Sequence, residues 1–188
     1  MRLNDTREHT EETDGCAVDG VEIRVVDDNR HEVPHGQEGE EASRGPQVFV
    51  GYWGEPEMTA RALDADGWYY SGDYCRTDSE GRYIRITGRK KDIIVRGGEN
   101  ISSREVEDIV LEYPGVREAA VVAMPDERLG ERSCACVSMR PGAPAMHLTD
   151  LVAFFDGRRV AKYKFPEYLV VLDALPRTSS GKLQKFAL

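Results

Sequence analysis

Apolar residues occur in short runs separated by charged or glycine-containing turns, and their spacing changes near residue 88. Before that point, β-branched and aromatic runs favour strands, and one short amphipathic run favours a helix. Strands are predicted at residues 21–26, 68–70 and 83–86, and a hairpin turn at 78–81 joins the last two. An acidic, turn-rich segment is expected after the first strand, to about residue 41, and a short helix at residues 58–63.

After residue 88 the pattern alternates between the strand period and the helix period. Ile93, Ile94 and Val95 predict a strand, and a helix is expected over residues 102–113, with Ser102 and Glu105 as a capping box. Further strands are predicted at residues 119–124, 133–139 and 168–172, and a second helix, capped by Thr149, ends near residue 157.

This order of elements predicts an α+β fold, with a small β-rich subdomain followed by a compact mixed α/β domain. The boundary is placed at residues 88–92, which gives predicted domains at 16–88 and 89–188. The first fifteen residues are polar, without an apolar period, and are predicted to be disordered.

Composition narrows the class of protein. The 188 residues carry a formal net charge of −9, which argues against a general nucleic-acid binder. No apolar run is long enough to span a bilayer and no signal-peptide core is present, so we expect a cytoplasmic protein, with peripheral membrane association left open. The four cysteines lack zinc-type spacing, and Cys134 and Cys136 are interpreted as buried free thiols rather than a metal site or a disulfide.

Four features are candidates for binding or chemistry. Gly97-Gly98, followed by Glu99, lets the backbone pass close to another molecule, although such glycines are more often structural. Asp73 follows a glycine at a strand end, where its carboxylate would accept hydrogen bonds from vicinal hydroxyls or merely stabilise a turn. Arg89 would clamp a sugar or phosphate, or remain a solvated charge. Lys182 lies in a polar Thr-Ser-Ser-Gly-Lys loop that would present one ammonium to a phosphate, or is a surface lysine near a mobile terminus.

A basic cluster, Arg158, Arg159, Lys162 and Lys164, contrasts with the acidic composition. It would meet a polyanionic ligand such as a nucleotide, or form a solvated face.

Taken in order, these features resemble the C-terminal part of the adenylate-forming superfamily, which includes acyl-CoA synthetases, luciferases and peptide-synthetase adenylation domains. The likeness is greatest to bacterial short- or medium-chain fatty acyl-CoA ligases. The matching runs are GYW at 51–53, PEMT at 56–59, GWYYSGD at 67–73, GRKKD at 88–92, GGENI at 97–101, EVE at 105–107 and PRTSSGK at 176–182.

The resemblance implies an ATP-dependent carboxylic acid–CoA ligase that forms an acyl-adenylate and then a thioester. Its substrates would be ATP with Mg²⁺, coenzyme A and a short- or medium-chain fatty acid. Asp73 and Arg89 would bind the nucleotide, and Lys182 would bridge the acyl carboxylate and the α-phosphate. Lys91 would be the hinge of a mobile C-terminal domain, and Gly97, Gly98 and Glu99 would form the loop beside coenzyme A. In this scheme, residues 16–88 are the last β subdomain of the large AMP-binding domain.

Family members are much longer, and no Ser/Thr/Gly-rich phosphate loop is found here. We therefore expect a C-terminal portion that lacks most of the acyl pocket and the magnesium-binding motif, is inactive alone and depends on the missing N-terminal portion. Two alternatives remain. The first is a non-catalytic interaction module or half of a split enzyme. The second is an adenylating part that serves a carrier-protein thiol.

Overall fold

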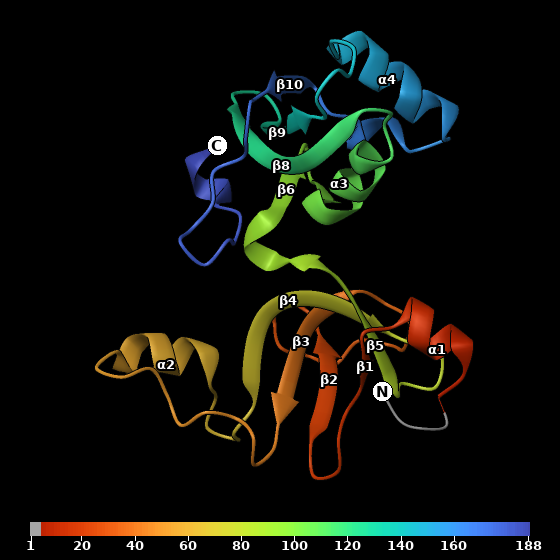
Figure 1. Ribbon diagram of the computed structural model, residues 1–188. Coiled ribbons are helices and arrows are strands. Elements are labelled where there is room, and N and C mark those ends of the chain that lie inside the picture. Colours follow the sequence, from red (N-terminus) through yellow and green to blue (C-terminus); the bar gives the residue numbers. More distant parts are fainter. Residues whose placement is uncertain (1–4) are drawn as a thin grey trace. The chain divides into compact units, whose positions relative to one another are not determined.

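The computed structural model describes residues 5–188, which divide into two units, one ending at Lys91 and the other beginning at Asp92. Each unit is built around its own β-sheet (Figure 1). The first unit is β-rich and the second combines strands with two longer helices, which confirms the predicted α+β class.

The first unit contains a five-stranded antiparallel sheet in the order β1-β5-β4-β3-β2. Its elements are α1 (Arg7–Glu12), β1 (Gly15–Cys16), β2 (Glu22–Val26), β3 (Gly39–Arg44), α2 (Pro56–Ala62), β4 (Tyr69–Thr77) and β5 (Tyr83–Arg89). The hairpin predicted at residues 78–81 is confirmed: it joins β4 to β5, and the side chain of Asp78 accepts the backbone N–H of Arg82 at 2.7 Å.

The prediction of a turn-rich segment to residue 41 is wrong from Gly39 onward, where β3 begins. Gly39 packs against β2 so closely that a Cβ at this position would lie 2.4 Å from the carbonyl oxygen of Val26. Ala42 is fully buried beside Trp68 and Tyr70. One small buried side chain therefore suffices to anchor a strand that is otherwise polar.

Residues 1–15 are the segment for which disorder is predicted from the sequence. The structure describes α1 and the start of β1 in this segment, whereas residues 1–4 fall outside the described part of the chain. The side chain of Thr6 caps α1 by accepting the backbone N–H of His9. The imidazole ring of His9 stacks on Tyr83 at 3.8 Å between centroids, and the backbone of Asp14 bonds to β5. Contacts with β5, rather than any apolar period of its own, order this segment.

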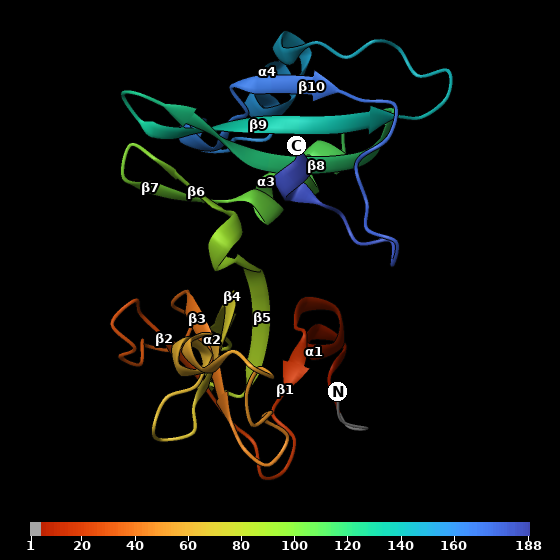
Figure 2. The same cartoon turned by 90° about the vertical axis from the view of Figure 1, so that its left-hand side faces the viewer.

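The second unit contains a sheet in the order β10-β9-β6-β7, with β8 also paired to β9 (Figure 2). Only the β9–β10 pair is parallel among the pairings described. Its elements are β6 (Ile93–Arg96), β7 (Glu99–Ser102), α3 (Ser103–Leu111), β8 (Val116–Asp126), β9 (Gly130–Met139), α4 (Leu148–Gly157) and β10 (Tyr168–Val171), with 3₁₀ turns η2 (Lys162–Lys164) and η3 (Lys185–Ala187). The 3₁₀ turn η1 (Lys90–Asp92) contains the boundary between the two units.

Helix capping in this unit is partly as predicted. The side chain of Ser102 accepts the backbone N–H of Glu105, which confirms the cap of α3. Thr149 is not the cap of α4; the N-cap is His147, whose backbone N–H donates to the side chain of Asp150 at 3.0 Å. Strand β7 was not predicted, because only Ile101 in this polar run is buried and the strand exists through its pairing with β6.

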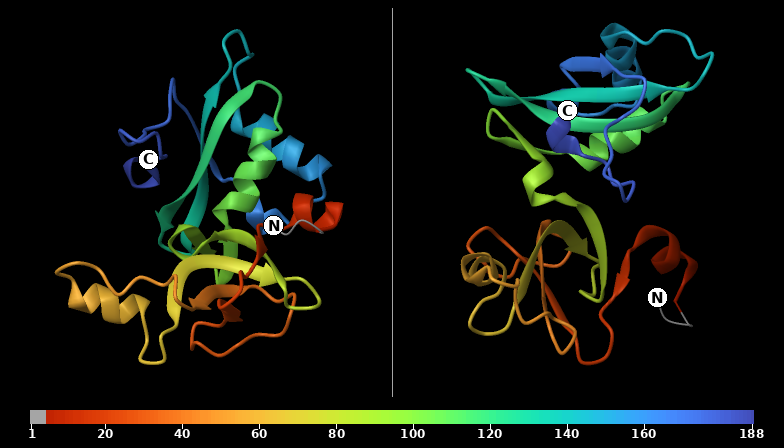
Figure 3. Two further views of the ribbon diagram at one scale, coloured as in Figure 1. Left: turned by 60° about the horizontal axis from the view of Figure 1, so that its bottom comes forward. Right: turned by 60° about the vertical axis from the view of Figure 1, so that its left-hand side comes forward.

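The strand β9 is covered on both faces. Ala135 and Val137 face α3 and α4 in the main core, whereas Cys134 and Cys136 face the C-terminal segment through Leu183 and Leu188. Figure 3 (left) shows this segment on the side of β8 and β9 that is opposite α3. No helix among residues 5–188 is long and apolar enough to cross a bilayer.

A carboxylate links three parts of the second unit. Glu167 accepts two hydrogen bonds from the guanidinium of Arg96, at 2.8 and 3.0 Å, and one from Arg132 at 2.8 Å. The hydrogen bonds from Arg96 outweigh the effect of burial and hold the pKa of Glu167 below its usual value. Residue 167, just before β10, is thereby tied to β6 and β9.

We expect Phe155→Ala to destabilise the second unit by about 3–5 kcal/mol, because the Phe155 side chain is fully buried on α4. Both tryptophans, Trp53 and Trp68, lie in the first unit. Urea unfolding followed by circular dichroism should therefore shift, while the tryptophan fluorescence transition should not. Val152→Ala on the same helix, where the side chain is 37% exposed, is the control. Equal effects of the two substitutions would contradict this account of the core.

We expect Glu167→Gln to lower stability at neutral pH by about 1–2 kcal/mol, since two charge-assisted pairs are weakened. A carboxylate whose pKa is lowered in the folded state stabilises it above the unfolded pKa of about 4.3, and this contribution disappears as pH falls through the folded pKa. The stability difference between the two proteins, measured by urea unfolding, should be constant above about pH 5 and shrink below it. A difference that does not change with pH would be inconsistent with this role, and exposed Glu127→Gln serves as the control.

Candidate active site

Asp73 and Arg89 face one another across the β4–β5 pair. They are register partners, and the Nε of Arg89 donates to Oδ1 of Asp73 at 3.1 Å. Gly72, just before Asp73, has a φ of +73°, a conformation that favours glycine. The hydroxyl of Ser71 accepts the backbone N–H of Asp73 at 3.1 Å. Within the described chain, Oδ2 of Asp73 has no hydrogen bond, so it remains available to a ligand hydroxyl.

Glu40 and Lys90 form a second charged pair that stabilises the turn at Gly72. Oε1 of Glu40 accepts the backbone N–H of Gly72, and Oε2 accepts the ammonium of Lys90, both at 3.0 Å. Lys90 also pairs with Asp28 at 2.8 Å. Burial alone would lower the pKa of Lys90, but hydrogen bonds to Asp28 and Glu40 raise it above its usual value. Sequence reasoning missed these residues, because the partners lie far apart in the chain.

The β4–β5 pair and the start of η1 line an open cavity of about 470 Å³. This volume lies in the range typical of small-molecule sites. It is lined by Ser71, Gly72, Asp73, Arg89, Lys90 and Lys91. The side chain of Lys91, the predicted hinge residue, is exposed at this rim, one residue before the second unit begins. The structure thus brings Asp73, Arg89 and Lys91 together in the first unit.

Gly97 and Gly98 form a two-residue turn between β6 and β7, since Arg96 and Glu99 are register partners. Their φ angles are +59° and +90°, as a type I′ hairpin requires. A Cβ at Gly97 would lie 3.2 Å from Leu129, whereas one at Gly98 would meet nothing within 4 Å. Both glycines and Glu99 are exposed in the second unit, so the turn presents open backbone.

Lys182 ends a tight turn in the C-terminal segment of the second unit. The backbone N–H of Thr178 donates to the carbonyl of Lys182 at 2.8 Å, and the hydroxyl of Thr178 accepts the N–H of Lys182 at 3.0 Å. Gly181 supplies the φ of +84° that the turn needs. The side chain of Lys182 is exposed, and its ammonium has no ion pair or hydrogen bond within residues 5–188. A free cation on an ordered turn is suited to meet an anionic group.

Two of the four residues of the basic cluster are paired with acids. Arg158 pairs with Glu112 at 2.9 Å and lies over the ring of Phe154. Lys164 pairs with Glu105 at 2.6 Å. These contacts favour a structural role for Arg158 and Lys164 over binding of a polyanion.

The cysteines are free, and three of them are buried. The sulfur atoms of Cys134 and Cys136 lie 4.0 Å apart on one face of β9, as the strand period predicts. The hydrogen bond to Cys136 and burial raise the pKa of the Cys134 thiol. Among the described residues, no group of three histidine, cysteine or acidic side chains is placed to hold a metal ion.

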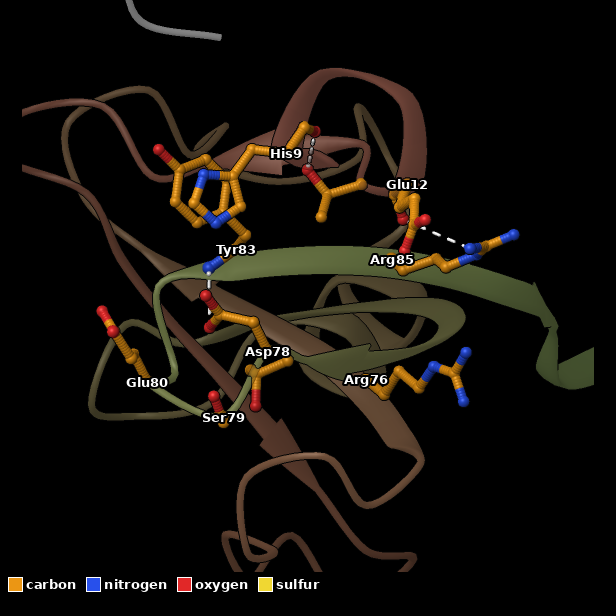
Figure 4. Close-up of a pocket in the computed structure, with 10 residues that line it drawn as sticks. His9, Glu12, Arg76, Asp78, Ser79, Glu80, Tyr83 and Arg85 are labelled. Atoms are coloured by element: carbon orange, nitrogen blue, oxygen red, sulfur yellow. Dashed lines mark hydrogen bonds between the residues drawn. The ribbon is translucent and has the colours of Figure 1, made fainter. Parts of the chain in front are cut away.

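A second cavity, of about 340 Å³, lies between α1 and the β4–β5 hairpin and contains none of the predicted site residues (Figure 4). The stacked rings of His9 and Tyr83 form one wall. A guanidinium N–H of Arg85 donates to the backbone carbonyl of Glu12 at 3.3 Å. This bond and the stacked rings join α1 to β5, which favours a structural junction.

Comparison with known proteins identifies two matching regions. Residues 105–182 match the AMP-binding enzyme C-terminal domain, and residues 1–53 match the AMP-binding enzyme family. The medium-chain fatty-acid–CoA ligase of Escherichia coli is 64% identical over all 188 residues, which cover 33% of that protein. A putative acyl-CoA synthetase of Bacillus subtilis, YngI, is 38% identical over 188 residues, again all of this chain and 34% of the relative.

Solved structures agree. ATP-bound MatB from Rhodopseudomonas palustris superposes with a TM-score of 0.85 at 37% identity, over 93% of this chain and 34% of that one. The o-succinylbenzoate-CoA synthetase MenE of Bacillus subtilis, with its acyl-adenylate intermediate, gives a TM-score of 0.85 at 29% identity, over 95% of this chain and 36% of that one. This chain spans about one third of the length of the proteins it matches. With the two-unit fold and the ordered motifs, these matches show that the chain belongs to the AMP-binding, adenylate-forming enzymes.

Proposed function

We propose that this chain supplies the nucleotide-binding edge and the mobile lysine-bearing domain of an ATP-dependent fatty acid–CoA ligase. One observation carries the proposal: Asp73 and Arg89 are paired at the rim of a ligand-sized cavity, in a chain 64% identical to the medium-chain ligase of Escherichia coli. The full reaction would join a short- or medium-chain fatty acid to coenzyme A through an acyl-adenylate.

In this proposal, Asp73 binds the ribose of ATP. A carboxylate accepts from two vicinal hydroxyls, and Asp73 has Oδ2 available while Arg89 fixes Oδ1. Arg89 is 60% exposed, which leaves most of its guanidinium free for the same nucleotide. Glu40 and Lys90 keep the turn at Gly72 in place by bonding to its backbone and to each other.

Lys182 is the proposed catalytic residue of the adenylation step. As the fatty-acid carboxylate attacks the α-phosphate and pyrophosphate leaves, negative charge builds on the phosphoryl oxygens. An ammonium held on an ordered turn stabilises this charge without reorganisation, and one such donor contributes roughly 3 kcal/mol. The absence of a competing partner among the described residues supports this assignment.

The second half-reaction needs a different surface. We propose that the second unit rotates about Lys91, that Lys182 is thereby withdrawn, and that the Gly97-Gly98-Glu99 turn meets the thiol arm of coenzyme A. A glycine turn with open space at Gly98 suits the passage of an extended chain. The division of the chain into units that meet between Lys91 and Asp92 supports the domain boundary predicted at residues 88–92.

The two alternatives receive no support from the comparisons. A non-catalytic module would not need an unpaired Lys182, and three of the relatives named above are described as CoA ligases or CoA synthetases. Transfer to a carrier-protein thiol has no specific observation in its favour.

We expect the 188-residue chain alone to release no pyrophosphate from ATP in the presence of octanoate, coenzyme A and Mg²⁺. The reason is that it matches only 33% of the length of its ligase relative, and the phosphate loop and most of the acyl pocket are expected in the remainder. A coupled pyrophosphate assay tests this directly. Release above background that is lost in Lys182→Ala would mean that the chain holds all the catalytic groups itself.

Joined behind the upstream two thirds of the Escherichia coli ligase, the chain should form octanoyl-CoA. In that joined enzyme, Lys182→Ala should lower the rate of acyl-adenylate formation by roughly 10²–10³-fold. Asp73→Asn should instead mainly raise KM for ATP, because it weakens ribose binding. Lys162→Ala, an exposed lysine of the same unit without an ion pair among the described residues, is the control. A fully active Lys182→Ala enzyme would overturn the proposed role.

A further inference from the structure

The C-terminal segment carries two lysines with opposite surroundings. Lys182 is exposed and unpaired among residues 5–188, whereas the side chain of Lys185 is only 22% exposed. The ammonium of Lys185 donates to Oε1 of Glu107 at 2.6 Å and to the hydroxyl of Ser103 at 2.9 Å. It also lies 3.8 Å from Oδ2 of Asp92. Two hydrogen bonds and a third, nearby carboxylate oxygen thus hold the Lys185 ammonium within the fold.

The partners of Lys185 are themselves fixed. Ser103 is the first residue of α3 and Glu107 lies one turn later, with its side chain 12% exposed. Oε1 of Glu107 also accepts the backbone N–H of Val121 in β8 at 2.7 Å. Lys185 therefore connects the C-terminal segment to α3 and, through Glu107, to the central sheet.

The other end of the same turn is held by Arg177. Its guanidinium donates to the carbonyl of Gly181 at 2.7 Å and to the carboxylate of Glu118 in β8. Glu118 also accepts the hydroxyl of Ser138 at 3.1 Å. The turn that presents Lys182 is thus fixed on both sides, by Arg177 before it and by Lys185 after it.

We propose that Lys185 is a positioning residue for Lys182: it fixes the turn to α3 and to Asp92 so that the free ammonium is held in one place. This inference rests on the proposed role of Lys182. Asp92 directly follows Lys91, the proposed hinge residue, and is the first residue of the second unit. The same contacts therefore make the lysine turn move with the unit as one body when the hinge rotates.

A double-mutant cycle in the joined enzyme tests the coupling. Lys185→Met keeps the length of the side chain and removes its charge, and it should lower kcat for acyl-adenylate formation roughly tenfold with KM for ATP little changed. Lys185→Arg, which keeps the charge, should restore most of the rate. In the Lys182→Ala background, Lys185→Met should cost less than about twofold, because it acts through Lys182.

The outcomes separate the two ideas. If Lys185→Met lowers the rate tenfold with and without Lys182, it acts through the fold in general and the inference is wrong. If Lys185→Met has no effect while Lys182→Ala does, the inference fails but the proposed function stands. If Lys182→Ala has no effect, the role of Lys182 fails and the inference falls with it.

A second readout uses the 188-residue chain itself. Trypsin cleavage after Lys182, followed by mass spectrometry, should be about tenfold faster in Lys185→Met, because the turn is released from α3. Lys185→Arg should remain as slow as the unchanged chain, and Lys162→Met, a matched exposed lysine, should have no effect. Equal cleavage rates in Lys185→Met and the unchanged chain would show that Lys185 does not hold the turn.

Discussion

The double coverage of β9 is the constraint on which the second unit depends. Because side chains alternate along a strand, Ala135 and Val137 pack beneath the helices while Cys134 and Cys136 pack beneath the C-terminal segment. A single strand therefore divides its residues between two apolar clusters. The helices stabilise one side, and the segment that carries Lys182 has to cover the other. The position of the proposed catalytic lysine is in this way a consequence of core packing, and not only of its own turn.

In the first unit, local charge matters more than the total. The chain has a net charge of −9, yet the cavity rim presents Arg89, Lys90 and Lys91. Glu40 accepts a hydrogen bond from Lys90, and Asp73 accepts one from Arg89. These acidic side chains therefore orient the basic side chains as well as offsetting their charge. In the proposed function, this rim would meet an anionic nucleotide even though the chain as a whole is acidic.

Structural features that depend on short stretches of sequence could be predicted, whereas contacts between residues far apart in the chain could not. The Ser102 cap, the hairpin turn at Asp78 and the run of strands in the second unit follow from short-range patterns, and the ordered motifs indicated the family. Strand β7 was missed because its polar residues are held by pairing with β6. The contact between Glu40 and Lys90 joins residues fifty positions apart, so no local pattern reveals it. Threonine is a common N-cap residue, which is why Thr149 was predicted, but the backbone geometry makes His147 the N-cap of α4. The roles of individual site residues came from the family resemblance, since each residue alone allowed an ordinary structural explanation.

The parallel pairing of β9 with β10 has a consequence for the order of assembly. Antiparallel neighbours such as β8 and β9 meet through a short turn, but β10 reaches β9 only after residues 140–167, including α4, have crossed over. Contacts that close such long loops form late, because the entropy of closure opposes them. The C-terminal segment follows β10, so the face with Cys134 and Cys136 stays uncovered until then. The lysine turn is consequently among the last parts of the unit to form, and a chain that has not completed its core has no ordered Lys182.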